Sequence, residues 1–329
     1  MERAELTIMT AITVTILGLA GPMQAAALWI HEIQYTTDPN GTSPLHGHII
    51  DCTGGIVTHI PPTGRPRLII QDPNYPDGWG AIQAKDLFST GVFADVSVGD
   101  WVSFTNVLVE DNKGTTFLQY IEDNNSRLTI VSTNNPIPRP RTVTVDEIAA
   151  PTEGLDAWLA VDHNAEKYEA MLIKIINVSV KDTGYGKAYD NYILQSRLDP
   201  NLTCWASDYM NGDKDKGQIY HPYTEIGQDL CGVTGVLEQY TAEQEGIYYD
   251  YYQLLTTGAK DFTIEQAADL DDDCDADAVD FRIFAEHWLE SGCSGPDWCG
   301  GADLAKDHAD GVVNAFDLLK FAEHWLEGK

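Results

Sequence analysis

The stretch WVSFTNVLVEDNKGTTFLQYI, from Trp101 to Ile121, decides the fold class of this chain. Two runs rich in β-branched and aromatic residues, Trp101–Glu110 and Thr115–Ile121, flank the tetrapeptide Asp111-Asn112-Lys113-Gly114. Such runs favour strands, and a short polar segment with a glycine between them is typical of a tight hairpin. The sequence therefore predicts a β-hairpin here and a β-rich fold around it.

Similar runs, bounded by Gly, Pro, Asn or Asp, occur in two blocks of the chain. In residues 28–133 the expected strands are His46–Ile60, Arg67–Gln71, Gly80–Ala84, Trp101–Glu110 and Thr115–Ile121. In residues 142–262 they are Ala170–Lys181, Tyr189–Leu194, Thr203–Ser207, Leu230–Tyr240 and Tyr248–Leu255. The proline-rich segment between the blocks, residues 134–141, predicts a stiff extended linker. Five strands without an amphipathic helix predict a small barrel in each block.

Short motifs mark both blocks. The first contains Ile69-Ile70-Gln71-Asp72-Pro73, Val98-Gly99-Asp100-x-Val102 and Gly114-Thr115-x-Phe117-Leu118. The second contains Tyr168-Glu169-x-Met171-Leu172 and Gly232-Val233-Thr234-Gly235-Val236. These residues resemble the OB-fold modules found in secreted bacterial proteins, some of them beside extracellular nuclease domains. The resemblance implies a mainly β protein with two tandem OB-like five-stranded barrels.

The chain is strongly acidic: its 329 residues include 51 Asp and Glu against 20 Lys and Arg, for a formal net charge of -31. Proteins that bind phosphates present basic faces, so this balance counts against nucleic acid as the partner. It favours divalent cations, neutral polymers or other proteins. Nucleic acid stays as the less favoured alternative, because OB folds frequently bind it.

The first 27 residues read as a secretory signal peptide. Thr7–Ala20 is uncharged and mostly apolar, Gly21-Pro22 follows, and Ala25-Ala26-Ala27 offers small residues for cleavage before Leu28. An uncleaved anchor is the alternative, although about 14 residues are short for a membrane span. No later segment has 18 consecutive apolar residues. The sequence therefore predicts a secreted or cell-surface protein without a span in the mature chain.

Six cysteines follow the signal, and an even count in an exported chain permits disulfides. Cys204 and Cys231 lie in neighbouring predicted strand segments and are the first candidate pair. With that pair formed, at least one of the three C-terminal cysteines stays free or reaches Cys52. Cys293 and Cys299 bracket a connector in the C-terminal segment and could close it.

The C-terminal segment, residues 263–329, contains a duplicated unit. Phe284-Ala285-Glu286-His287-Trp288-Leu289-Glu290 recurs unchanged as Phe321–Glu327, at a period of 37 residues. Identity over seven residues indicates a repeat rather than a solvated charge run. Apolar residues at i, i+3, i+4 and i+7 across Asp280–Leu289 predict that each copy forms a short helix.

An acidic loop precedes each helix. In the first copy, carboxylates occupy relative positions 1, 3, 5, 9 and 12, and position 7 offers a backbone carbonyl, which is the spacing of a calcium loop. The predicted ligands are Asp269, Asp271, Asp273, Asp275, Asp277 and Asp280. Crowded carboxylates repel one another, and Ca²⁺, with six to eight oxygen ligands, removes that repulsion. Each copy thus consists of a loop followed by a helix, which corresponds to half of an EF-hand, and the segment contains two such copies.

This segment resembles the dockerin type I domain, which has two calcium loop–helix units about a pseudo-twofold axis. Cys274 departs from the usual glycine at position 6, where a left-handed conformation costs about 1 kcal/mol. The second loop lacks acids at positions 1 and 3 unless an insertion supplies them, and its candidate ligands are Asp303, Asp307, Asp310, Val312, Asn314 and Asp317. The resemblance implies a cohesin-like or other surface protein as partner. Ala278-Val279 and Ala315-Phe316 replace the Ser or Thr that often recognises cohesin, so surface attachment or intramolecular docking is the alternative.

No motif supplies a catalytic set: no GxSxG, SxxK or phosphate-binding glycine-rich loop occurs. The sequence therefore predicts a non-catalytic binding or attachment protein, accessory to extracellular polysaccharide breakdown or surface assembly. A carbohydrate or a protein is the expected ligand of the barrels. The candidate aromatic faces for stacking on sugars are Tyr75, Trp79, Trp205, Tyr209 and the run Tyr248–Tyr252. The alternative is a secreted OB-fold nucleic-acid-binding protein associated with extracellular nucleases.

Overall fold

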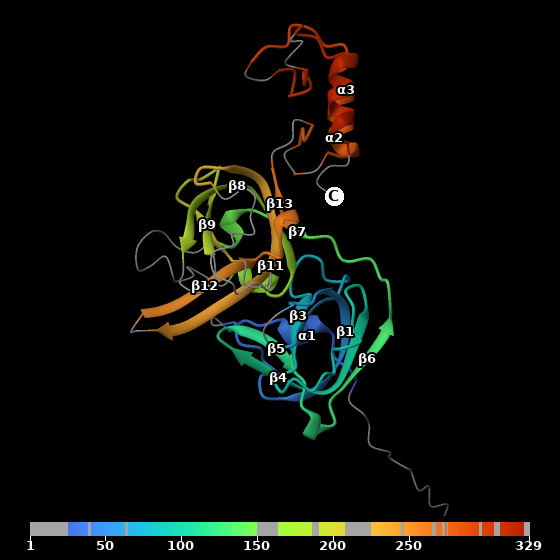
Figure 1. Ribbon diagram of the computed structural model, residues 1–329, viewed down its shortest axis with the longest axis vertical. Coiled ribbons are helices and arrows are strands. Elements are labelled where there is room, and N and C mark those ends of the chain that lie inside the picture. The colour runs from blue at the N-terminus through green and yellow to red at the C-terminus, as the bar shows by residue number, and fades with distance from the viewer. Residues whose placement is uncertain are drawn as a thin grey trace, which may run out of the picture.

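The computed structural model shows a mainly β protein with two closed five-stranded barrels, followed by a small tail that carries helices α2 and α3 (Figure 1). It describes residues 26–38, 41–62, 65–149, 164–185, 191–207, 225–244, 247–264, 268–271, 274, 276–295, 298–305 and 310–325. The expected signal peptide, residues 1–27, lies outside this part of the chain except for its last two residues. Among the described residues, no helix is long and apolar enough to cross a membrane.

The first barrel has five strands in its wall and a sixth on its edge. They are β1 (Ile49–His59), β2 (Arg67–Gln71), β3 (Ala81–Lys85), β4 (Trp101–Asn112), β5 (Thr115–Gln119) and β6 (Arg127–Ser132). Neighbours follow the order β1-β2-β3-β5-β4, and β4 pairs back onto β1, which closes the barrel. β6 adds to β4 from outside. The predicted OB-like barrel is confirmed.

The hairpin predicted within Trp101–Ile121 joins β4 to β5. Asn112 pairs with Thr115, and the two residues between them, Lys113 and Gly114, have φ angles of 60° and 82°. Two central residues with positive φ form a type I′ turn, whose twist matches that of the flanking strands. The predicted hairpin is therefore confirmed.

Alternating side chains and one helix fill the first barrel. Val102 and Phe104 on β4 point into the core, whereas Ser103 between them is less buried, as a strand with one buried face requires. Helix α1 (Ile30–Gln34) adds Ile30 and Ile33, both fully buried in the same core. Helix α1 was not predicted from the sequence, because five residues are too few to show a helical period.

The second barrel repeats the same strand order. Its wall is β8 (Leu172–Tyr185), β9 (Asn191–Ser196), β10 (Thr203–Ser207), β12 (Ile247–Leu255) and β11 (Asp229–Gln244), closed by β11 on β8. Two short strands extend it, β7 (Arg141–Val143) on β8 and β13 (Phe262–Thr263) on β11. Arg141 therefore belongs to this sheet and not to the linker, and Thr263 to this sheet and not to the tail. The 3-10 turns are η1 (Glu122–Asn124), η2 (Val145–Glu147), η4 (Asn164–Tyr168) and η6 (Ala259–Asp261).

The tail has one small core made by equivalent residues of its two copies. Helix α2 (Ala278–Glu286) is capped by Asp277 and helix α3 (Ala315–Glu323) by Asn314, each through the side chain. Phe284 and Phe321 meet at 5.4 Å between ring centroids, in a core that also holds Ala268, Ala302, Ala276, Val313, Leu270 and Leu304. Each helix ends at a Glu before the repeated His-Trp pair, so it is shorter than the predicted one.

Two disulfides form, Cys231–Cys274 and Cys293–Cys299. The second closes the connector that Cys293 and Cys299 bracket, as the sequence suggested. The expected Cys204–Cys231 bridge is wrong, because β12 lies between β10 and β11 and Cys204 points into the barrel core as a buried thiol. Cys52 is likewise a buried free thiol.

The first barrel packs the face made by β2, β3 and β5 against the second barrel. Ile69, fully buried, contacts Val236 and Leu255. Hydrogen bonds cross the same boundary from Gln83 Nε2 to Glu238 Oε1 (3.3 Å) and from Thr115 Oγ1 to the Gln239 carbonyl (3.1 Å). Strands two and three form the usual ligand face of an OB fold. In the first barrel that face is buried between the barrels.

Candidate functional site

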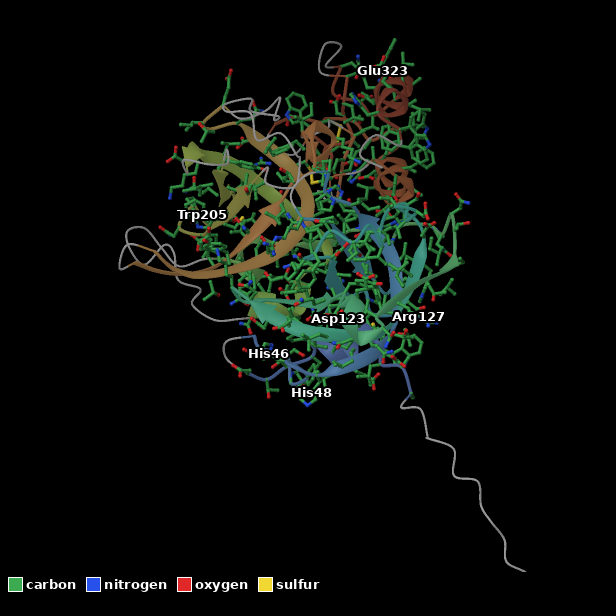
Figure 2. All side chains as sticks on the ribbon, turned by 60° about the horizontal axis from the view of Figure 1, so that its bottom comes forward. His46, His48, Asp123, Arg127, Trp205 and Glu323 are labelled. Atoms are coloured by element: carbon green, nitrogen blue, oxygen red, sulfur yellow. A yellow bond between two sulfur atoms is a disulfide. The ribbon has the colours of Figure 1, made fainter. Side chains whose placement is uncertain are left out.

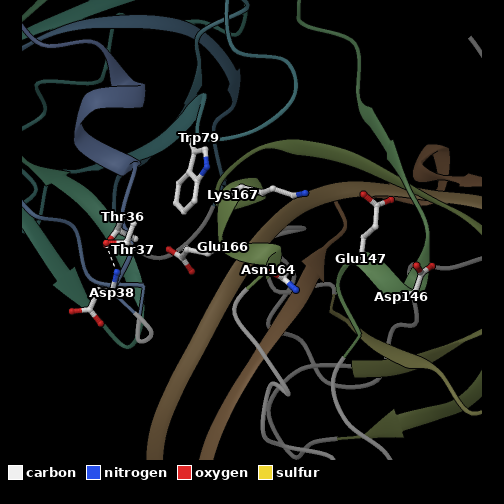
Figure 3. A pocket seen from close by; sticks show the side chains of 9 residues that line it. All are labelled: Thr36, Thr37, Asp38, Trp79, Asp146, Glu147, Asn164, Glu166 and Lys167. Atoms are coloured by element: carbon white, nitrogen blue, oxygen red, sulfur yellow. Dashed lines mark hydrogen bonds between the residues drawn. The ribbon is translucent and has the colours of Figure 1, made fainter.

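A cavity of about 550 Å³ opens where the two barrels meet (Figure 3). The first barrel lines it with Thr36, Thr37, Asp38 and Trp79, and the second with Asp146, Glu147, Asn164, Glu166 and Lys167. This volume lies in the range of small-ligand sites. Of these residues only Trp79 was predicted from the sequence, because the others lie in connecting segments that show no motif.

Trp79 is held by both barrels. It lies in the β2–β3 loop with a φ of 61°, a left-handed conformation that is rare for a bulky residue. Its amide donates to the Lys167 carbonyl in the second barrel (2.5 Å), and its ring meets Tyr35 edge-on at 5.5 Å between centroids. Tyr75 stacks on His31 at 4.6 Å between centroids. A residue kept in a strained conformation from two sides points to function.

Tyrosine hydroxyls orient two of the carboxylates at the cavity. Tyr252 donates to Oε2 of the buried Glu166 (2.8 Å), and Tyr168 donates to Oε1 of Glu147 (2.8 Å). The Lys167 ammonium lies 4.7 Å from the centre of the Tyr168 ring. Four carboxylates and one ammonium line the cavity, so it presents a negative field and fixed hydrogen-bond acceptors.

Glu169 lies in the barrel interface close to Glu166. It is buried and accepts hydrogen bonds from the Thr116 amide (3.1 Å) and from Gln34 Nε2 (3.3 Å), both in the first barrel. Burial raises the pKa of Glu169 well above its usual value, and the negative charge of Glu166 raises it further. Burial also lowers the pKa of Lys85 at the same interface.

Trp205 and Tyr251 do not line the cavity. Trp205 is only 4% exposed and packs against Tyr251 on the outer side of the second barrel (Figure 2), so the prediction that it is an open stacking face is wrong. Tyr252 follows Tyr251 in the chain and points into the barrel core, as strand alternation requires. Tyr209 lies outside the described residues.

The first acidic loop gathers three of its predicted ligands. Carboxylate oxygens of Asp269, Asp271 and Asp280 all lie within 4.8 Å of one another. Asp280 is fully buried and accepts from the Leu270 and Asp277 amides, both at 2.7 Å, whereas Asp277 turns its side chain to the Val279 amide. Asp273 and Asp275 lie outside the described residues. Hard carboxylate oxygens at this spacing fit Ca²⁺.

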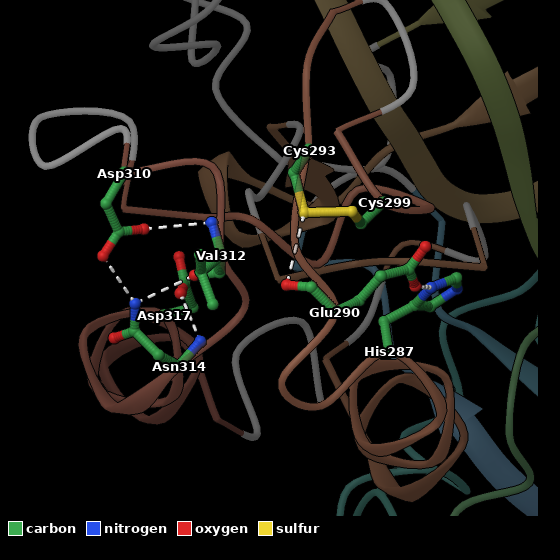
Figure 4. The surroundings of a disulfide bond; sticks show 8 residues. All are labelled: His287, Glu290, Cys293, Cys299, Asp310, Val312, Asn314 and Asp317. Atoms are coloured by element: carbon green, nitrogen blue, oxygen red, sulfur yellow. Dashed lines mark hydrogen bonds and ion pairs between the residues drawn. A yellow bond between two sulfur atoms is a disulfide. The ribbon is translucent and has the colours of Figure 1, made fainter.

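The second loop repeats the backbone hydrogen bonds of the buried aspartate, but no three of its described carboxylates lie within 4.8 Å of one another. Asp317 is buried and accepts from the Ala305 and Asn314 amides, both at 2.8 Å, as Asp280 does in the first loop. Figure 4 shows Asp310 accepting from the Val312 amide and from Asn314 Nδ2. Asp303 is buried at the start of this loop. Asp307 lies outside the described residues.

No protein-family model matches the chain, and no curated protein matches it. Among solved structures, a murine DNA-binding protein bound to double-stranded DNA has 12% identity and a TM-score of 0.32, covering 62% of this chain and 88% of its own. Fission yeast Pot1 with single-stranded DNA has 13% identity and a TM-score of 0.28, with coverages of 70% and 90%. Both scores are low, so the assignment as OB-like barrels rests on the strand order of this chain.

Proposed function

We propose that this chain is a non-catalytic extracellular binding protein whose cavity between the barrels holds a saccharide. The proposal depends on one observation, the cavity that has Trp79 at its edge and carboxylates in its wall. Indole and phenol rings offer broad apolar faces with low conformational entropy, which suit the apolar face of a sugar ring. Oriented carboxylates accept hydrogen bonds from sugar hydroxyls.

The charge of the cavity narrows the class of sugar. Four carboxylates against Lys167 disfavour sugars that carry carboxylates or sulfates, because like charges repel in a partly desolvated site. Neutral or amine-bearing saccharides are the expected ligands. This preference agrees with the net charge of -31 of the whole chain.

Calorimetric titration of the full chain with neutral, amine-bearing and uronic oligosaccharides tests the proposal. Trp79→Ala is expected to weaken binding at least tenfold, which corresponds to about 1.4 kcal/mol. Trp29→Ala is the matched control, because Trp29 is an exposed tryptophan that does not line the cavity. Binding that survives Trp79→Ala unchanged would place the sugar elsewhere.

Nucleic-acid binding is the second candidate. OB barrels bind oligonucleotides as well as oligosaccharides. Arg127 at the start of β6, Arg139 in the linker and Arg141 at the start of β7 are exposed, and Arg141 forms an ion pair with Asp77. If these residues bind phosphates, the affinity for a labelled single-stranded oligonucleotide falls steeply with salt, and replacing the three arginines by glutamine reduces the slope. Undetectable binding at low salt removes this candidate.

For the tail we propose calcium binding through the two acidic loops, in the manner of a dockerin-like module that attaches the protein to a cohesin-like or other surface protein. Ca²⁺ would be held by Asp269, Asp271 and Asp280 in the first loop and by Asp303, Asp310, Asn314 and Asp317 in the second. Two disulfides support export, because they persist in oxidising compartments. Circular dichroism and calorimetry with calcium against EGTA test the metal, and N-terminal sequencing of exported protein tests the signal peptide.

A further inference from the structure

Cys274 takes the backbone conformation that glycine takes in the other copy of the repeat. Its φ is 74°, and Gly311, at the equivalent position 6 of the second loop, has a φ of 69°. A left-handed conformation costs a residue with a side chain more than it costs glycine. The first loop therefore contains a conformation that its own sequence disfavours, and a contact that fixes the turn would offset that cost.

The second barrel contacts this turn through a disulfide and a hydrogen bond. Cys274 is bonded to Cys231 on β11, and the Lys174 ammonium on β8 donates to the Cys274 carbonyl (3.0 Å). The Cys274 amide donates to Oδ2 of Asp269 (2.9 Å), the carboxylate at position 1 of the loop. Sγ of Cys231 lies 3.2 Å from the same oxygen. The bridge thus fixes the turn, and the amide of the turn holds the first predicted ligand.

We propose that the Cys231–Cys274 bridge replaces glycine as the device that preorganises the first calcium loop, and that it couples cation binding there to the second barrel. The inference rests on the proposed calcium binding of the tail. Holding Asp269 in place before the cation arrives lowers the entropy that binding must overcome. Because the turn is bonded to β11, a cation that stiffens the loop also restrains that strand.

Three variants of the full chain test this device. Cys231→Ser with Cys274→Ser removes the bridge and keeps a side chain at the turn, and it is expected to lower calcium affinity about tenfold. Cys231→Ser with Cys274→Gly removes the bridge but restores a residue suited to the turn, so a large part of the affinity is expected to return. Cys293→Ser with Cys299→Ser is the control for the loss of a disulfide in the tail.

Hydrogen–deuterium exchange gives the second readout. In the wild type, calcium is expected to slow exchange of amides in β11 near Gly232 and Val233; in Cys231→Ser with Cys274→Gly it slows exchange in the tail alone. Lys174→Met keeps the bridge and is expected to retain most of the protection of β11 by calcium. It is the test to use if the cysteine variants do not fold, and loss of that protection in Lys174→Met would then overturn the proposal. Equal calcium affinity in all variants, or equal protection of β11 without the bridge, overturns the proposal. A wild type that takes up no calcium overturns it together with the calcium proposal.

Discussion

The first barrel meets the second through a broad face of side chains, whereas the second barrel is joined to the tail by a covalent bridge. At the boundary between the barrels, Ile69 packs on Val236 and Leu255, and hydrogen bonds from Gln83, Gln34 and Thr116 reach buried glutamates. At the boundary with the tail, the described contacts centre on Cys231–Cys274 and on the Lys174 ammonium.

The difference follows from the size of the parts. Each barrel buries its own core and still has an apolar face to offer a neighbour, whereas the tail has a core of only a few small residues and two phenylalanines. Small units with little apolar surface commonly depend on disulfides or metals for stability. The first junction should therefore be sensitive to packing and to pH, and the second to redox state and to calcium.

The largest effect is expected from the bridge to the tail. Cys231–Cys274 closes a separation of 43 residues and Cys293–Cys299 one of 6, so chain entropy predicts losses of about 4 and about 2 kcal/mol on replacement by serine. Urea unfolding of the two double-serine variants measures both losses. Equal costs would show that the longer loop brings no advantage.

At the boundary between the barrels, Ile69→Ala is expected to cost about 3 kcal/mol, because it leaves a cavity in a fully buried apolar contact. The barrels should then unfold in two steps, which calorimetry resolves. Ile130→Ala on β6 is the control: its side chain is 37% exposed, and a change within about 0.5 kcal/mol is expected. A single unchanged transition in Ile69→Ala would argue against coupling through this face.

Glu169 makes the same boundary dependent on pH, with a smaller effect. Its pKa is raised in the folded state, so the folded protein binds more protons than the unfolded chain above about pH 4.3. Its contribution to stability is full below that pH and is lost as pH rises through the folded-state pKa. Glu169→Gln should remove this loss, so the difference between its urea midpoint and that of the wild type should increase in favour of the variant as pH rises. The urea midpoint of Glu122→Gln, at an exposed position, should change with pH as the wild type does.

The smallest effect is expected at Lys174. Lys174→Met keeps the aliphatic stem and removes the hydrogen bond to the Cys274 carbonyl, a loss of about 1 kcal/mol. Thermal unfolding with the disulfide intact measures it, and Lys260→Met, at an exposed position, is the control. A loss as large as that of the bridge would mean that the ammonium, rather than the disulfide, anchors the tail.

The strands were predictable because their signals are local. The turn at Lys113-Gly114 and the alternation of β4 are properties of adjacent residues. The repeat that carries Phe284 and Phe321 is visible as identity between two short segments. Helix α1 gave no such signal because it is short, and Trp205 was misjudged because burial of the outer side of a strand depends on what packs there.

The junctions were not predictable, because they depend on residues far apart in the sequence. Cys231 and Cys204 looked like partners until the strand order placed β12 between them. The cavity is lined by residues as far apart in the sequence as Asp38 and Lys167, and neither residue belongs to a motif. Nothing in the sequence around Cys274 indicates that its turn is held by a strand 43 residues earlier.

The two free thiols, Cys52 and Cys204, affect how the other four cysteines form their native disulfides. Burial raises the pKa of each to about 12, so neither is present as the thiolate that attacks a disulfide. Six reactive cysteines could pair completely in fifteen ways, but four can do so in only three. If the barrels fold before the cysteines oxidise, Cys52 and Cys204 are buried and do not form disulfides. The other four cysteines then have only three possible complete pairings.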